Sequence, residues 1–530
     1  MKLLQHYLSR QAEHRPDAVA ISWKGESVSY AELEQLSNRL ARMLKSQGCR
    51  RGDRVALLLP KSPLAIMSML GALKADCSYT PIDTRNPSIR VARVLGLLEA
   101  RCVLATGSTG DLLRDAFQHL PSTGGSTPAV GLLETGTQAS SWGAQFGLDD
   151  LTSCSAAHLE QGNTSQDAAH ILFTSGSTGT PKGVVITHAN VIHFVEWAVT
   201  HFGLGPSDRV SGHSPLHFDL STFDVYGSLA AGATLYPIPP EANLLPHKLA
   251  ELIESAELTQ WFSVPSILHH MAKLDVVRQG AFPSLRRLLW CGERFPTSGL
   301  IYWMNRLPHV EFTNLYGPTE TTIASSHYTV AQVPEDERKE IPIGRGCGDE
   351  ELLVLDAELR PAPVKTTGDL YIRGAGLSPG YWRDAERTAA AFVPDPLIEE
   401  PGARLYRTGD LAYVDEAGMV VLVGRADTQV KSRGYRIELG EIEAALDGIP
   451  ELQESAVVAV GSEGFEGTVL CCAYVSRAGG EIAPALLRQR LAVVLPAYML
   501  PSRWMRLERL PLNGNGKTDR PALKGLWRND

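Results

Sequence analysis

FTSGSTGTPKG, residues 173–183, lies between the apolar segments 171–172 and 184–186, both of which have the pattern of buried strands. Glycines let a backbone fold closely around an anion, hydroxyl groups donate short hydrogen bonds, and the lysine supplies positive charge. The usual P-loop ends in Gly-Lys-Ser/Thr, whereas here Pro181 precedes Lys182 and Gly183 follows it. A surface linker can have this composition, but it needs no buried strand on either side. The stretch therefore predicts a phosphate-binding loop of another kind.

Composition narrows the class of protein. The chain has 530 residues, 44% of them hydrophobic, which is enough for more than one domain. A net charge of -9 argues against a nucleic-acid-binding surface, so a nucleotide must be held locally. The 8 cysteines show no CxxC spacing, as is typical of a reduced cytoplasmic protein without a thiolate-bound metal. The polar N-terminus and the lack of a long apolar run predict neither a signal peptide nor a membrane span.

Strand and helix patterns alternate in the first part of the chain. Residues 29–32 fit a capping box, and Leu33, Leu36, Leu40, Met43 and Leu44 then repeat at helical spacing until Gly48. A strand at 55–59, a helix at 66–73 and a strand at 79–83 follow, which indicates a parallel sheet covered by helices. From 106 to about 166 the chain is rich in Gly, Ser and Thr, and we expect loops around one or two elements there.

The second half of the chain has a different pattern of secondary-structure elements. Short, turn-bounded strands between 343 and 424 indicate a β-rich subdomain, and a smaller α+β unit follows, with a helix through Ile442 and Leu446 and strands at 456–460 and 469–475. We therefore expect an α/β fold. A large N-terminal domain, residues 1–426, contains βαβ-layered subdomains and the β-rich subdomain. A small mobile C-terminal domain, residues 427–530, follows a hinge at Asp427.

An ordered series of motifs runs along nearly the whole chain. It comprises 30–33, 73–76, 81–83, the loop 173–183, Phe218-Asp219-Leu220-Ser221, 314–320 (NLYGPTE), 368–370, 406–411 (YRTGDL), 424–443, 495–501 and 515–520 (NGKTDR). Together these motifs resemble the acyl-adenylating superfamily, and within it the amino-acid-activating adenylation enzymes of nonribosomal peptide and related biosynthesis. The resemblance implies that a substrate carboxylate attacks the α-phosphate of ATP, which releases pyrophosphate and leaves an acyl-adenylate.

The resemblance also assigns roles to residues. Tyr316 stacks on adenine, Asp410 binds the ribose hydroxyls with help from Arg425, and Glu320 is the Mg²⁺ ligand, since an oxygen donor suits that hard cation. Lys517 is the catalytic residue, an ammonium on a glycine-flanked loop that bridges the carboxylate and the α-phosphate. The implied ATP-binding set is Thr174, Ser175, Gly176, Ser177, Thr178, Gly179, Lys182, Gly292, Glu293, Arg294, Asn314, Tyr316, Gly317, Thr319, Asp410 and Arg425. Taken alone, the Lys517 segment or Asp410 could be ordinary turns, and Tyr316 could be core packing.

Asp219 directs the choice of substrate. In amino-acid-activating relatives, the aspartate of this motif pairs with the substrate ammonium; the alternative is a helix N-cap. Asp224 lies about 140° further round a helix of about 3.6 residues per turn, so a structural role is expected for it. The remaining pocket residues carried over from the family are uncharged: Leu220, Phe223, Phe262, Leu289, Cys291, Leu315, Ile323 and Ala324. Bulky Leu220 and Phe223 predict a short cavity.

We expect a small aliphatic amino acid, with a short β-amino acid such as 3-aminobutanoate preferred. A D-alanine or other small α-amino acid:carrier-protein ligase, and an acyl-CoA ligase for a non-amino acid, remain alternatives. The chain ends at Asp530 without a Gly-Gly-x-Ser phosphopantetheine site, so we expect the thiol acceptor in trans, on a separate carrier protein or coenzyme A. For thioester formation, the family implies that residues 431–438 enter the site while Lys517 moves away. A degenerate scaffold protein would be expected to have lost Lys517, Asp410 or Glu320, and all three are present.

Overall fold

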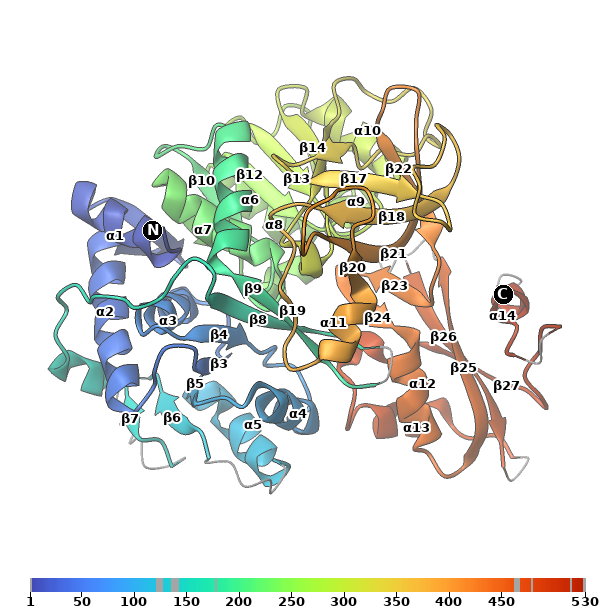
Figure 1. Ribbon diagram of the computed structural model, residues 1–530, viewed down its shortest axis with the longest axis horizontal. Helices are drawn as coiled ribbons and strands as arrows, with labels where there is room; N and C mark the ends of the chain where they lie inside the picture. Colours follow the sequence, from blue (N-terminus) through green and yellow to red (C-terminus); the bar gives the residue numbers. More distant parts are fainter. Residues whose placement is uncertain are drawn as a thin grey trace.

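The computed structural model describes residues 2–120, 127–134, 143–176, 179–461, 468–477, 480–514 and 517–527. A large N-terminal part contains layered sheets and helices, and a smaller α+β unit lies beside it, coloured orange to red in Figure 1. This arrangement confirms the predicted fold class. In the part of the chain that the structure describes, no helix combines the length and apolar character needed to cross a bilayer.

The predicted phosphate-binding loop connects two antiparallel strands, in which Thr174 pairs with Lys182. These strands belong to a sheet whose centre is parallel, and β9 is flanked by a short strand from far along the chain. In spatial order its members are β19 (Gly380–Tyr381), β9 (Lys182–Thr187), β8 (Ala168–Thr174), β4 (Ser78–Pro81), β3 (Arg54–Leu58), β5 (Cys102–Ala105), β6 (Ala129–Leu132) and β7 (Phe146–Gly147). The loop therefore lies at the end of a buried strand pair, as expected.

Helices of the N-terminal region follow the predicted patterns, with one correction. The capping box is formed: the Ser29 side chain accepts from Glu32 N, and the Glu32 carboxylate accepts from Ser29 N. Between 106 and 166 we expected loops around one or two elements. The structure has more regular structure there, namely a helix, two short strands and a 3-10 turn. The helical elements here are α1 (Gln5–His14), α2 (Tyr30–Ser46), α3 (Pro63–Lys74), α4 (Ser88–Leu98), α5 (Gly107–Gln118) and the 3-10 turn η2 (Asp149–Ser153).

A second large sheet carries parallel strands at its centre. Its order is β16 (Arg345–Gly346), β15 (Ser326–Thr329), β14 (Glu311–Tyr316), β13 (Arg287–Trp290), β12 (Gln260–Ser263), β10 (Arg209–Gly212), β11 (Thr234–Pro237), β1 (Val19–Trp23) and β2 (Glu26–Ser29). The associated helices are α6 (His188–His201), α7 (Leu220–Ala231), α8 (Pro246–Ser255), α9 (Pro265–Lys273) and α10 (Thr297–Arg306), with 3-10 turns η3 (Pro240–Leu244) and η4 (Thr319–Thr321). Cys291 and Gly317 directly follow the carboxyl ends of β13 and β14, the usual position of ligands in such sheets.

The β-rich subdomain is also as predicted. It contains β17 (Glu351–Leu355), β18 (Gly368–Arg373), β20 (Phe392–Pro394), β21 (Arg404–Val414) and β22 (Val420–Arg425), with α11 (Ala385–Ala391) beside them. Asp410 on β21 pairs in register with Arg425 on β22, so the subdomain places these charged residues side by side.

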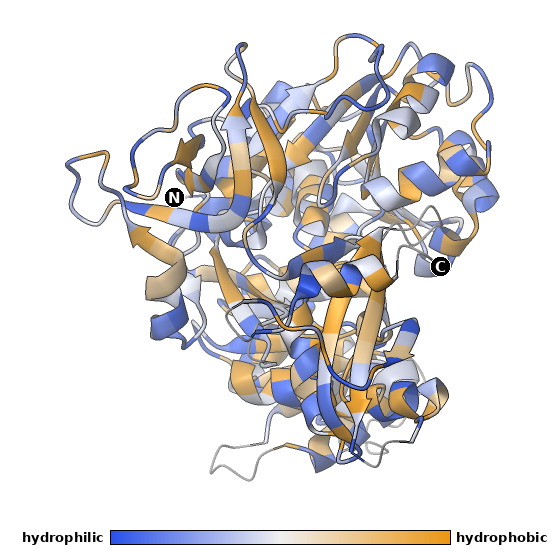
Figure 2. Cartoon of the chain, turned by 90° about the vertical axis from the view of Figure 1, so that its right-hand side faces the viewer, coloured by the Kyte–Doolittle hydropathy of each residue, from blue (hydrophilic) through white to orange (hydrophobic). Residues whose placement is uncertain are grey.

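The C-terminal unit follows β22. It consists of β23 (Gln429–Ser432), β24 (Tyr435–Glu438), α12 (Leu439–Asp447), β25 (Leu452–Gly461), β26 (Thr468–Ser476), α13 (Pro484–Leu491), the turn η5 (Ala497–Met499), β27 (Arg503–Arg506) and α14 (Arg520–Leu526). Both predicted strands and the helix through Ile442 are confirmed. Figure 2 shows the apolar residues of these strands between helices whose outer surfaces are hydrophilic.

Candidate active site

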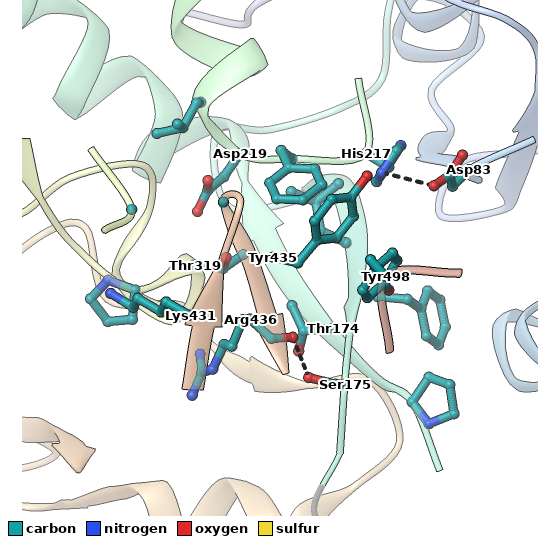
Figure 3. A pocket seen from close by; sticks show the side chains of 18 of the residues that line it. Asp83, Thr174, Ser175, His217, Asp219, Thr319, Lys431, Tyr435, Arg436 and Tyr498 are labelled. Atoms are coloured by element: carbon teal, nitrogen blue, oxygen red, sulfur yellow. Dashed lines mark hydrogen bonds and ion pairs between the residues drawn. The ribbon is translucent and has the colours of Figure 1, made fainter. Parts of the chain in front are cut away.

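A cavity of about 140 Å³ lies where the C-terminal unit meets the N-terminal part. Residues predicted from the sequence line it from several elements: Thr174, Ser175, Asp219, Leu220, Cys291, Gly292, Gly317, Thr319, Asp410 and Arg425. Lys431, Tyr435 and Arg436 enter the same space from β23 and β24, as Figure 3 shows. The cavity is smaller than the about 300–1,000 Å³ of typical small-molecule pockets, because these side chains occupy part of it.

The phosphate-binding loop has the close backbone packing that its glycines predict. A Cβ atom at Gly176 would lie 2.1 Å from the carbonyl oxygen of Thr180, so only glycine fits there. Gly179 has a φ of +78°, in the left-handed region. Ser175 Oγ donates to the carbonyl of Arg436 at 2.7 Å, which ties the loop to the C-terminal unit. Ser177 and Thr178 lie outside the described residues.

Glu320 is fully buried among cations. Its Oε1 accepts from Lys182 Nζ at 2.9 Å and from Tyr381 Oη at 2.8 Å, and its Oε2 accepts from Arg436 at 2.7 Å. Burial alone would raise the pKa of Glu320, but Arg436 and Lys182 outweigh it and hold that pKa below its ordinary value. The carboxylate is therefore ionised. Within the described residues no cluster of His, Cys, Asp or Glu makes a metal site of its own.

The predicted ribose-binding group is a compact set of hydrogen bonds. Tyr316 Oη donates to Asp410 Oδ2 at 2.6 Å, and Arg425 Nη1 donates to Asp410 Oδ1 at 2.8 Å. Arg425 also binds both carboxylate oxygens of Asp427, at 2.7 and 2.6 Å. The ammonium of Lys431 lies 5.5 Å from the centre of the Tyr316 ring. The face predicted to stack on adenine is thus covered by Lys431 in this arrangement.

Asp219 precedes α7, yet its side chain makes no capping hydrogen bond to that helix. The carboxylate instead faces the cavity near Thr319 (Figure 3). Burial raises the pKa of Asp219 to about 6, and the hydroxyl of Thr319 and the amide of Leu220 only partly oppose this effect. Asp224 is fully buried near Lys61 and does not line the cavity, in agreement with the structural role expected for it. Of these two aspartates, Asp219 is therefore the one that faces the cavity.

The uncharged residues predicted for substrate binding pack into one apolar cluster. Leu220 and Cys291 reach the cavity surface. The others lie behind them in the same cluster: Phe223, Phe262, Leu289, Leu315, Ile323 and Ala324. Phe223 meets Phe194 and Phe262 edge-on, with ring centres 5.5 and 5.9 Å apart. These rings are buried in the cluster and do not line the cavity.

Other predicted residues lie outside the cavity. Arg294 is largely exposed and pairs with Glu340, and Asn314 donates to the carbonyl of Pro342. Glu293 accepts from the amide of Gly434, so it contacts the C-terminal unit rather than a nucleotide. Lys517 is exposed and does not line the cavity; its amide donates to Asn513 Oδ1 at 3.1 Å. In this structure Lys431 therefore lines the cavity, whereas Lys517 lies outside it.

A polar group at the other side of the cavity was not predicted from the sequence. His217 Nε2 lies 3.5 Å from Asp83 Oδ2, and Arg85 donates to Tyr435 Oη at 2.6 Å. Tyr435 stacks on Tyr498, with ring centres 3.7 Å apart. Each of these residues lies in one of the motifs listed above or within two residues of one. The motifs therefore indicated where this group lies, but no residue type in them indicated its function. A second cavity, of about 430 Å³, adjoins it and is lined by both parts of the chain.

The raised pKa of Asp219 predicts a pH dependence. The carboxylate gains a proton as the pH falls through about 6, and a neutral Asp219 cannot pair with an ammonium group. We expect kcat/KM for the acid substrate to fall about tenfold per pH unit below pH 6. An Asp219→Asn variant should lack this acid limb, while the Kd for ATP should not follow it in either protein. The same acid limb in the Asn variant would contradict the assignment.

Two known protein families match this chain. Residues 8–382 match the family described as AMP-binding enzyme, and residues 441–517 match the AMP-binding enzyme C-terminal domain. The chain belongs to the AMP-binding enzyme family. The predicted resemblance to adenylate-forming enzymes is thereby confirmed. The cavity is lined by the first matched region, by residues 408–436 between the two matches, and by Tyr498 of the second.

Several known proteins are similar to this chain over all or nearly all of its length. Tyrocidine synthase 3 of Brevibacillus parabrevis is 34% identical over 530 residues, and the chain spans only 8% of its length. The Vibrio cholerae adenylation domain AlmE, solved with glycyl-adenosine-5'-phosphate, is 25% identical with a TM-score of 0.84, over 99% of this chain and 98% of that one. Holo-PA1221, a protein containing adenylation and PCP domains, is 27% identical with a TM-score of 0.79, over 98% and 84%.

Proposed function

We propose that this enzyme adenylates a small aliphatic amino acid with ATP and then transfers the acyl group to a phosphopantetheine thiol on a carrier protein. The observation that carries the proposal is Asp219, a carboxylate facing the cavity that also contains Thr174, Asp410 and Arg425. A buried anion is costly without a positive partner. An ammonium group on the substrate would supply that partner, whereas a plain carboxylic acid would not.

The first half-reaction joins a substrate carboxylate oxygen to the α-phosphorus of ATP as the bond to pyrophosphate breaks. We assign the β- and γ-phosphates to the loop from Thr174 to Lys182, and the ribose to Asp410. Glu320 would hold Mg²⁺: its carboxylate is an oxygen donor, and the buried hydroxyl of Thr174 lacks a hydrogen-bond partner among the described residues. The ion would neutralise phosphate charge. Arg436 must leave Glu320 Oε2 for this ligation.

The second half-reaction is attack of a thiol sulfur on the acyl carbonyl carbon, which releases AMP. The second cavity offers a route for a long, thin thiol, since it adjoins the first and shares Asp83, Phe218 and Tyr435 with it. Arg433 and Arg488 also line it and suit a phosphate group on that arm. We propose that residues 427–530 rotate about Asp427 between the two half-reactions. That the carrier is a separate protein remains a prediction.

For the substrate, we favour a short β-amino acid such as 3-aminobutanoate. The apolar cluster behind Leu220 limits the length of the side chain. A β-amino acid places its ammonium one carbon further from the carboxylate, and a bulky Leu220 beside Asp219 is compatible with that spacing. A small α-amino acid, such as D-alanine, is the second candidate, because the solved relative AlmE carries a glycyl adenylate.

Amino-acid-dependent exchange of pyrophosphate into ATP tests two claims: that the enzyme activates an amino acid, and that this is a β-amino acid. The panel is 3-aminobutanoate, β-alanine, D-alanine, L-alanine and L-valine, with butanoate as the acid that lacks an amino group. We expect exchange with a small amino acid at least about tenfold faster than with butanoate, since butanoate leaves Asp219 unpaired. A preference for an α-amino acid would refute the β-amino substrate alone. Equal or faster exchange with butanoate would refute amino-acid activation.

A further inference from the structure

Residues 319–325 form a strained turn that carries both charged and apolar groups of the active site. Glu320 lies near its start, and Ile323 and Ala324 near its end belong to the apolar cluster predicted for substrate binding. Thr322 and Ile323 have φ values of +64° and +69°, in the left-handed region that β-branched residues rarely adopt. Such a backbone keeps its shape only where its surroundings hold it.

The loop between β18 and β19 holds this turn. Thr322 Oγ1 donates to the carbonyl of Gly376 at 2.7 Å, and the amide of Ser378 donates to the carbonyl of Glu320 at 2.9 Å. A Cβ at Gly376 would lie 2.7 Å from the carbonyl oxygen of Thr321, so the two backbones are in direct contact. A displacement of Gly376 would therefore reach the turn at once.

Glu350 in turn binds Gly376. Its Oε1 accepts from the amide of Gly376 at 2.6 Å, and its side chain is only 2% exposed. A Cβ at Gly374 would lie 2.6–2.7 Å from the carboxylate atoms, so the loop backbone lies directly against this group. Glu350 and Thr322 thus bind the same glycine, one through its amide and the other through its carbonyl.

Stability alone does not account for a carboxylate at this place. Burial raises the pKa of Glu350 to about 7; the amide of Gly376 opposes the rise, and the charge of Asp349 adds to it. His193 Nε2 lies 3.5 Å from Glu350 Oε1, but burial lowers the pKa of His193, so this imidazole supplies little charge near pH 7. Glu350 Oε2 has no hydrogen-bond partner among the described residues. Burying an anion in this way is costly.

We propose that Glu350 is a positioning residue of the substrate pocket. It acts through Gly376 and Thr322 on the turn that presents the two apolar pocket residues, and so determines how well the amino acid is held. This inference rests on the proposed adenylation of an amino acid. ATP binding should be affected less, because the carboxylate of Glu320 is bound independently by Lys182.

Pyrophosphate exchange tests the proposal, with the amino acid of the panel above that reacts fastest and with ATP varied separately. Glu350→Leu fills much of the same space but leaves the amide of Gly376 unpaired, so the KM for the amino acid should rise about tenfold. Glu350→Gln keeps an acceptor oxygen and should stay within about threefold of the wild type. The KM for ATP should stay within about twofold in both. Glu351→Ala is the matched control, since it removes a half-exposed glutamate at the next position, and its values should equal those of the wild type.

Thr322→Val tests the same series of contacts from its other end. It removes the donor to the carbonyl of Gly376 and should raise the KM for the amino acid about fivefold to tenfold. Both substitutions act through one glycine, so the Glu350→Leu/Thr322→Val double variant should show a smaller rise than the product of the two single effects. Effects that multiply would overturn the inference. An equal rise of both KM values in Glu350→Leu, or a Glu350→Gln variant as impaired as Glu350→Leu, would do the same.

Thermal unfolding separates positioning from damage to the fold. A carboxyl group whose pKa is raised on folding lowers the stability of the fold above its ordinary pKa, so Glu350→Gln should unfold at no lower temperature than the wild type at pH 8. If Glu350→Leu does not fold, Thr322→Val decides, and an unchanged KM for the amino acid in that variant refutes the inference. A wild type that exchanges with an amino acid while the variants lack these shifts refutes this inference alone. A wild type that exchanges with none of the amino acids refutes the proposed function with it.

Discussion

Asp219→Ala is expected to lower kcat/KM for the amino acid by about a hundredfold to several thousandfold. Removing one partner of a buried ion pair costs about 3–5 kcal/mol, and each 1.36 kcal/mol is about a factor of ten in rate. The loss should concern the amino acid alone, because the groups that act on Asp219 do not include Asp410, Tyr316 or Arg425. Initial rates of pyrophosphate exchange at varied amino acid and fixed ATP measure it.

Two controls sharpen this result. Asp224→Asn removes a carboxylate from the same helix without touching the cavity, so the KM for the amino acid should change far less than with Asp219→Ala. The Asp219→Ala protein should also unfold at no lower temperature than the wild type, because burial already disfavours the ionised carboxylate. Unchanged exchange in Asp219→Ala would show that the ammonium binds elsewhere.

Lys517→Ala is expected to slow adenylate formation by about 10²–10³-fold, the usual loss when one group that stabilises developing charge is removed. Thioester formation from a chemically synthesised aminoacyl-adenylate should stay within about threefold of the wild type. The physical reason is the position of Lys517, which is exposed and outside the cavity when Lys431 and Arg436 occupy it. Pyrophosphate exchange measures the first step, and release of AMP upon addition of pantetheine measures the second.

Lys524→Ala is the matched control, since Lys524 is an exposed lysine on α14 of the same unit. Both of its half-reactions should match the wild type. If Lys517→Ala slowed both half-reactions equally, a structural role for the 513–519 segment would explain the loss better than catalysis. Unchanged pyrophosphate exchange would remove Lys517 from the mechanism.

The sequence predicted the elements that local interactions determine. The Ser29–Glu32 capping box is made by residues close in sequence, and the phosphate-binding loop is bounded by strands with strong apolar patterns. Helix α5 was missed because Gly107 and Gly110 are poor helix formers. Its order comes from tertiary contacts: Thr109 Oγ1 donates to the carbonyl of Leu58 at 2.8 Å, and Leu113 and Ala116 are buried.

The same distinction applies to the active site. The motifs correctly predicted that Asp219, Glu320 and Asp410 lie in one region. Each of them is held by a helix start, turn or strand of the N-terminal part. The ion-pair partner of Glu441 could not be predicted, since Arg90 lies 351 residues away in sequence and belongs to the other part of the chain. Sequence patterns describe domains separately and leave their relative position open.

The apolar cluster behind Asp219 has a consequence for how such an enzyme diversifies. Phe223, Phe262 and Leu315 belong to an apolar cluster of the N-terminal part, whereas α12 meets that part through the Arg90–Glu441 ion pair, which is not in the cluster. We expect a substitution that resizes this cluster to change which acid is accepted and to leave the contact between α12 and the N-terminal part intact. Residues that set the size of the acid and residues that join the two parts of the chain could then vary independently.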